Sequence, residues 1–93
     1  MDWISVLTDL GDFARKLARE IPPALSDPNI TSDQVTRLYQ VLEKQAQAVE
    51  RMVGTMNDED VGEHLIKAAE ALEDIFSDLA AAAANKMIEL RQA

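Results

Sequence analysis

Residues 58–91, DEDVGEHLIKAAEALEDIFSDLAAAAANKMIELR, are the stretch that decides the fold. Apolar side chains recur in it at three- and four-residue steps from Leu65 to Leu90, the spacing that places them on one face of a helix. The run Ala80–Ala84 favours the same structure, because alanine is the best helix former. The pattern predicts one long helix over residues 58–91, roughly 50 Å in length.

The preceding segment predicts a second helix over residues 32–53. Thr31 and Gln34 have the spacing of a capping box, in which each side chain binds a free backbone N–H at the start of a helix. Gly54 is predicted to end the helix, since glycine readily adopts the left-handed conformation that follows a last helical turn. The short connection to residue 58 makes the two helices antiparallel neighbours.

A shorter first helix is predicted over residues 2–20, followed by a linker over residues 21–31. Pro22 and Pro23 are expected to end this helix, because a proline ring disfavours helical backbone in the residue before it. The expected fold class is therefore all-α: a short first helix and an antiparallel hairpin with a long C-terminal helix, packed as a helical-bundle dimer. Whether the first helix packs on its own hairpin or on a second chain stays open.

Composition indicates one acidic domain over residues 1–93. Lys and Arg number 9 against 17 Asp and Glu, which gives a net charge of −8. Direct binding of nucleic acid is not expected, because phosphate contacts depend on Lys and Arg. The chain contains no Cys, which excludes disulfides and thiolate chemistry.

Targeting signals are not expected either. Asp2, Asp9 and Asp12 lie in the first twenty residues without a basic stretch before an apolar run, unlike a signal peptide. The longest uncharged apolar run, 79–84, has six residues, whereas a bilayer span needs about 20. We therefore expect a cytoplasmic protein with no membrane partner.

The unequal lengths of the two hairpin helices predict a homodimer. A second helix of roughly 33 Å would leave the last three turns of the third helix extending past Thr31. That overhang would be apolar and would need a cover, and two-fold dimers are the commonest oligomers. The predicted self-association residues are Leu79, Ala80, Ala83, Met87 and Leu90.

The negative charge is concentrated in the same C-terminal segment, because residues 57–93 hold nine acids and three bases. On a helical wheel the acids Glu63, Glu70, Asp74 and Asp78 lie opposite the apolar stripe. This face is either a solvated surface or the binding surface for a basic protein, whose approach its field would accelerate.

Catalytic and metal-binding patterns are weak. His64 is the single histidine, with Asp60 and Glu63 nearby, whereas a di-iron bundle needs a Glu-x-x-His motif on each of two helices and residue 61 is Val. The three glycines are isolated, which excludes a glycine-rich phosphate loop. We expect no enzymatic activity and no cofactor.

Two further residues, Gln45 and Trp3, each allow two interpretations. Gln45 is the polar member of an otherwise apolar heptad seam, where it either fixes the register of an assembly or reaches solvent from a looser bundle. Trp3 either caps the end of the bundle or anchors a partner.

These patterns favour a protein–protein interaction module, such as an adaptor, chaperone, immunity protein or antitoxin-like regulator. The first alternative is an acidic mimic of nucleic acid that blocks a basic site on another protein. The second is an exported helical hairpin, since the length and acidity are similar to those of small Trp-X-Gly exported proteins, although Met52-Val53-Gly54 at the predicted turn has no Trp.

Overall fold

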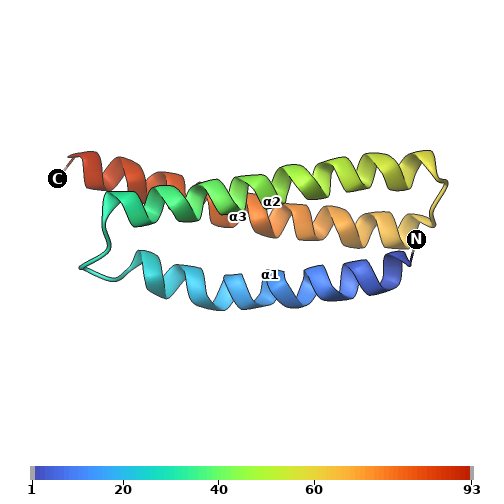
Figure 1. The fold of residues 1–93 in the computed structure, drawn as a ribbon, viewed down its shortest axis with the longest axis horizontal. Helices are drawn as coiled ribbons and strands as arrows, with labels where there is room; N and C mark the ends of the chain where they lie inside the picture. The colour runs from blue at the N-terminus through green and yellow to red at the C-terminus, as the bar shows by residue number, and fades with distance from the viewer. Residues whose placement is uncertain (1, 93) are drawn as a thin grey trace.

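The computed structural model describes residues 2–92 as three long helices: α1 (Trp3–Leu25), α2 (Ser32–Asp58) and α3 (Glu63–Gln92). They run side by side in a molecule of 49 × 20 × 16 Å, with α2 antiparallel to the other two (Figure 1). The all-α prediction is confirmed. None of α1, α2 and α3 combines the length and apolar character that crossing a membrane requires.

Both ends of helix α1 are capped by hydrogen bonds. The Asp2 carboxylate caps its start by accepting the Ser5 backbone N–H at 3.2 Å. The predicted end at residue 20 is wrong, because the helix continues through Pro22 and Pro23 to Leu25.

The helix continues because the residues around the prolines bury apolar surface. Ile21 and Leu25 lie one turn apart and both join the main core, where burial of such a side chain is worth about 1.5–3 kcal/mol. The Ser26 N–H donates to the Pro22 carbonyl at 3.1 Å and closes the last turn. Pro22 and Pro23 themselves are exposed. The linker shortens accordingly to Ser26–Thr31, where the Ile30 N–H donates to the Asp27 carbonyl at 3.1 Å and closes a turn over Pro28 and Asn29.

Helix α2 starts where the capping box places it and ends later than predicted. The Thr31 hydroxyl accepts the Gln34 N–H at 3.1 Å, and the Gln34 side chain accepts the Thr31 N–H at 2.9 Å. Gly54 does not end the helix, which continues to Asp58. A glycine inside a helix costs about 1 kcal/mol relative to alanine, and the complete burial of Met56 two residues later offsets that cost.

The true end of α2 is a Schellman motif centred on Asp60. Asp60 has a φ of 56°, its N–H donates to the Asn57 carbonyl at 3.3 Å, and the Val61 N–H donates to the Met56 carbonyl at 3.1 Å. These are the two bonds that define the motif, and its usual apolar contact is present because Val61 packs against the cluster that contains Met56. An aspartate here occupies the position that glycine usually takes.

Helix α3 begins at Glu63, so the predicted start at residue 58 is also wrong. The carbonyl of Gly62 accepts the N–H groups of Leu65 and Ile66 at 3.0 and 3.3 Å. With 27 residues in α2 and 30 in α3, the helices are about 40 and 45 Å long and nearly match. The predicted overhang of three turns therefore does not exist.

Most of the core lies between α2 and α3, with α1 packed along α3. Phe76 of α3 is completely buried, and its ring centroid lies 6.1 Å from that of Phe13 in α1. Ala14 of α1 is also fully buried, and Gly11 lies against Leu72. The first helix thus packs on its own hairpin, which answers the question that the sequence left open.

A second apolar cluster closes the end of the bundle at the α2–α3 loop. Leu7, Met56 and Ala69 are buried there, one from each helix, and Trp3 packs against them. The Trp3 indole N–H donates to the Glu59 carboxylate at 3.3 Å. Trp3 therefore caps the bundle, one of its two predicted roles.

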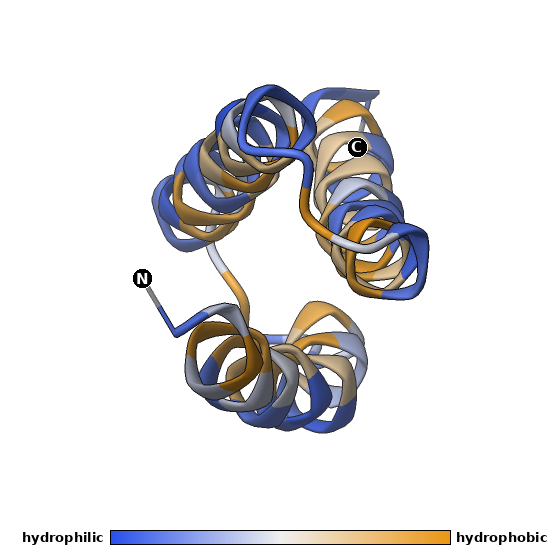
Figure 2. Ribbon diagram, turned by 90° about the vertical axis from the view of Figure 1, so that its right-hand side faces the viewer, coloured by the Kyte–Doolittle hydropathy of each residue, from blue (hydrophilic) through white to orange (hydrophobic). Residues whose placement is uncertain are grey.

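Viewed along the bundle, the helices occupy the corners of a triangle, with α1 standing apart from the α2–α3 pair (Figure 2). The extensive backbone contacts are those of α3 with α2 and with α1. Helices α1 and α2 therefore border an open face of the molecule.

Candidate interaction surfaces

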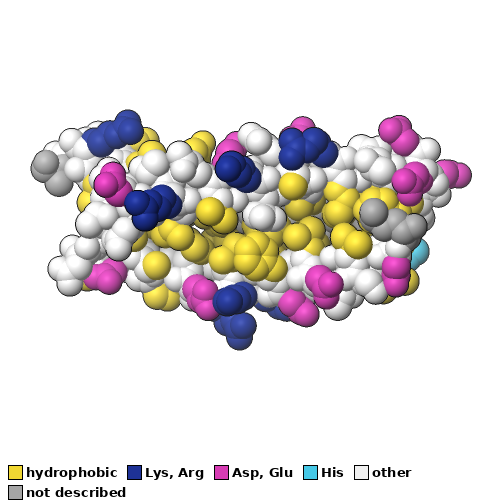
Figure 3. Space-filling view, in the orientation of Figure 1, with side chains coloured by type: hydrophobic (Ala, Val, Ile, Leu, Met, Phe, Trp, Pro, Cys, Tyr) yellow, Lys and Arg dark blue, Asp and Glu magenta, His cyan; other side chains and the backbone are white. Residues whose placement is uncertain are grey.

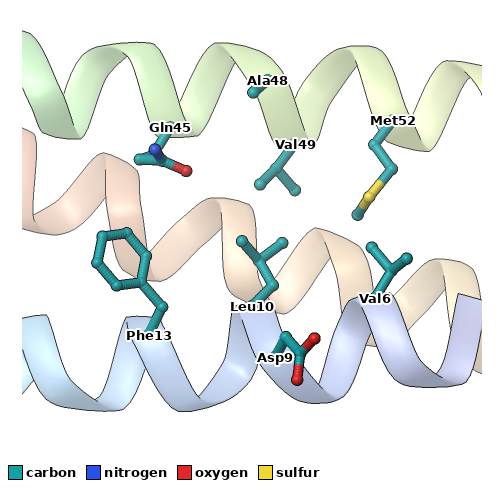
Figure 4. Close-up of a pocket in the computed structure, with 8 residues that line it drawn as sticks. All are labelled: Val6, Asp9, Leu10, Phe13, Gln45, Ala48, Val49 and Met52. Carbon is teal, nitrogen blue, oxygen red and sulfur yellow. The ribbon is translucent and has the colours of Figure 1, made fainter.

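An apolar hollow of about 390 Å³ lies between α1 and α2. Phe13, Leu10 and Val6 reach into it from α1, and Gln45, Val49 and Met52 reach into it from α2 (Figure 4). Asp9 and Ala48 complete its lining.

The same interhelical face holds a second hollow of about 340 Å³ near the α1–α2 linker. Its lining includes Ala24, Ile30, Leu38 and Arg37. Val41, whose side chain is 48% exposed, lies on α2 between the two hollows. We call the whole face the α1–α2 groove, and Figure 3 shows it as an apolar band along the length of the molecule.

Gln45 lies in this groove. It is half-buried and lines the hollow together with Phe13 (Figure 4). The heptad seam that the sequence identified on α2 therefore passes from the core to the groove, because Leu42 is buried in the chain's core, whereas Val49, although buried, lines the hollow together with the half-buried Gln45.

A row of bases follows the groove on the α2 side. Arg37, which lines the second hollow, is followed by Lys44 and Arg51 at seven-residue intervals, and all three are exposed. Within residues 2–92 the ion pairs join Arg15 to Asp12, Lys67 to Glu63 and Lys86 to Glu89. The three bases of α2 belong to none of these pairs.

The α1 side of the groove is mainly acidic. Asp9 lines the first hollow, and Glu20 follows it eleven residues later, which returns to the same side of a helix after three turns. Lys16 is the base between them, and Asp27 lies at the far end. The apolar groove thus has one basic border and one mostly acidic border.

The predicted acidic face of α3 is solvent-exposed. Glu63, Glu70, Asp74 and Asp78 are all exposed, and Glu63 pairs with Lys67 at 3.2 Å.

Two carboxylates that the sequence did not single out extend this face. Burial raises the pKa of Glu73 above its usual value, and the negative charges of Glu50, Asp74 and Glu70 raise it further. Glu73 follows Glu70 by one turn and could have been found on the helical wheel. Glu50 belongs to α2, and the sequence could not place it beside the acids of α3 because its position depends on how α2 packs against α3. We call Glu50, Glu70, Glu73, Asp74 and Asp78 the acidic face.

The residues predicted for self-association lie mostly in the chain's own core. Ala80 and Ala83 are buried there, and Leu79, Met87 and Leu90 are half-buried against the same cluster. Because α2 and α3 are nearly equal in length, the overhang of three turns that motivated this assignment is absent.

His64 is exposed at the start of α3. Across residues 2–92, no three His, Asp or Glu side chains gather closely enough to hold a metal ion. Comparison with known proteins adds no family to this description, since no family model, curated protein or solved structure gives a significant match.

Proposed function

We propose that this protein is a non-catalytic protein–protein interaction module of the adaptor, chaperone, immunity or antitoxin-like kind, and that it binds a basic partner through the acidic face. The observation that carries the proposal is the gathering of carboxylates from two helices, α2 and α3, around Glu73. The raised pKa of Glu73 reflects burial and the repulsion of Glu50, Asp74 and Glu70.

Repulsion of this kind supports a binding role because a partner can relieve it. Lysine or arginine side chains placed against the acidic face would interact favourably with several carboxylates at once. The concentrated negative field would also steer a basic protein to this side of the molecule and accelerate association. Both effects weaken as salt is added.

The test begins with recovery of the partner by affinity capture and mass spectrometry. We expect Asp74→Lys with Asp78→Lys to weaken binding of that partner by about tenfold or more, because both changes place bases on the acidic face. Asp33→Lys with Asp58→Lys is the matched control, since it changes the net charge equally at opposite ends of α2. Equal binding by the two double variants would contradict the proposal.

The nucleic-acid mimic is the second candidate, and the contribution of Glu50 from a second helix favours it. A mimic needs carboxylates on more than one element, and it would compete with a nucleic acid duplex for the recovered partner. The basic row Arg37, Lys44 and Arg51, which forms no ion pair within the described residues 2–92, favours the interaction module instead. The exported-hairpin alternative has less support, because α1 packs along the hairpin as an integral part of the core.

A further inference from the structure

We infer that the α1–α2 groove is covered by a second copy of this chain, in a two-fold dimer whose axis runs parallel to the helices. Each α1 then faces the α2 of the partner. This inference concerns a different face of the molecule from the acidic face and does not depend on the proposed function.

The apolar lining supports an arrangement in which two grooves face each other. Phe13, Leu10 and Met52 border a hollow that is open to solvent in a single chain. When two grooves meet, the four helices that border them become antiparallel neighbours around a shared apolar centre, which is the arrangement of a four-helix bundle. Helix α3 lies on the outside of each half.

The charged borders of the groove are self-complementary at two levels, on either side of the level at which Lys16 and Lys44 lie. Asp9 lies level with Val49 and Met52, which places it close to Arg51 along the bundle. Glu20 follows Phe13 by seven residues and Arg37 precedes Gln45 by eight, so Glu20 and Arg37 are also level. A two-fold axis parallel to the helices keeps these levels and places Asp9 and Glu20 of one protomer against Arg51 and Arg37 of its partner.

The distribution of charge also favours a second copy at this face. A chain with a net charge of −8 repels another copy most strongly through its acidic side. In the groove dimer the two acidic faces point outward on opposite sides. The surfaces that meet contain the bases of α2, which form no ion pair with another side chain of residues 2–92.

Gln45 takes a defined place in this dimer. It lines the middle of the groove, so the two copies of Gln45 lie at the same level on either side of the axis. A polar residue at such a position can specify the register and number of helices in an assembly. This is the first of the two interpretations that its heptad position allowed.

The first experiment measures mass by sedimentation equilibrium at micromolar concentrations. We expect the unmodified chain to be a dimer. Arg37→Glu with Arg51→Glu should raise the dissociation constant about tenfold or more, and so should Asp9→Lys with Glu20→Lys, because each makes the facing borders alike in charge. An equimolar mixture of the two double variants should recover the dimer as a heterodimer, in which positions 9 and 20 of each chain again face positions 51 and 37 of opposite charge.

Two controls separate these contacts from general charge effects. Arg15→Glu with Arg19→Glu makes the same charge change as Arg37→Glu with Arg51→Glu, but on the exposed back of α1. When it replaces that variant in the mixture with Asp9→Lys and Glu20→Lys, the heterodimer should no longer be favoured. Lys16→Glu should tighten the dimer although it makes the chain more negative, because Lys16 is the base on the acidic border. Circular dichroism should show unchanged helix content in every variant.

The outcomes decide the inference. A monomeric chain at high micromolar concentration would overturn it and leave the proposed function untouched, because the latter is measured by binding of the recovered partner. A dimer that is indifferent to both double variants would also overturn it, since its contact would then lie elsewhere.

Discussion

Phe76→Ala is expected to lower the free energy of unfolding by about 3–5 kcal/mol, the largest loss from any single truncation in this chain. Phe76 is 0% exposed and is among the largest of the completely buried side chains. It belongs to the main cluster, and its ring contacts that of Phe13. Removing it therefore leaves a cavity at the point where α1 is attached to the hairpin.

The loss can be measured by urea denaturation followed by far-ultraviolet circular dichroism. Small domains unfold with about 5–15 kcal/mol in total, so the variant should be only marginally folded. Ile88→Ala is the matched control, because Ile88 is apolar, lies on the same helix and is 51% exposed. Similar losses in the two variants would show that Phe76 does not hold the core together.

Ala83→Arg is expected to prevent folding of the single chain. Ala83 is 0% exposed and lies in the main cluster, so an arginine there must displace packed side chains and bury a charge without a partner. Losses above about 4 kcal/mol arise from this kind of change. Had Ala83 lain on an exposed overhang, the same substitution would have separated two chains and left each one folded.

Ala82→Arg provides a close comparison, since Ala82 is the exposed neighbour of Ala83. We expect this variant to keep the helix content and thermal unfolding temperature of the original chain. A well-folded Ala83→Arg protein would place Ala83 at the surface, in conflict with the packing described above.

The number and type of helices could be predicted from sequence because helical periodicity and the capping box are local signals. The helix ends could not. Pro22, Pro23 and Gly54 disfavour helix by local rules, and the burial of Leu25 and Met56 overrides them. Once α2 extends past Gly54 and α3 begins at Glu63, the overhang disappears.

Of the two interaction surfaces, one could be predicted from the sequence and the other could not. Glu63, Glu70, Asp74 and Asp78 could be placed on one exposed face from the helical wheel alone. The groove could not be found, because it depends on α1 packing against α3 and standing away from α2. The one local sign of the groove in the sequence was Gln45, a polar residue in a heptad pattern that is otherwise apolar and typical of a buried core.

The central claim, that the α1–α2 groove is covered by a second copy, is tested most directly by cross-linking at Gln45. The natural sequence has no cysteine, so Gln45→Cys and the control Ser77→Cys, exposed on α3, each carry one reactive thiol. With a short bismaleimide we expect rapid formation of a covalent dimer from Gln45→Cys and little from Ser77→Cys. Equal cross-linking of the two, or none at position 45, would contradict the groove dimer.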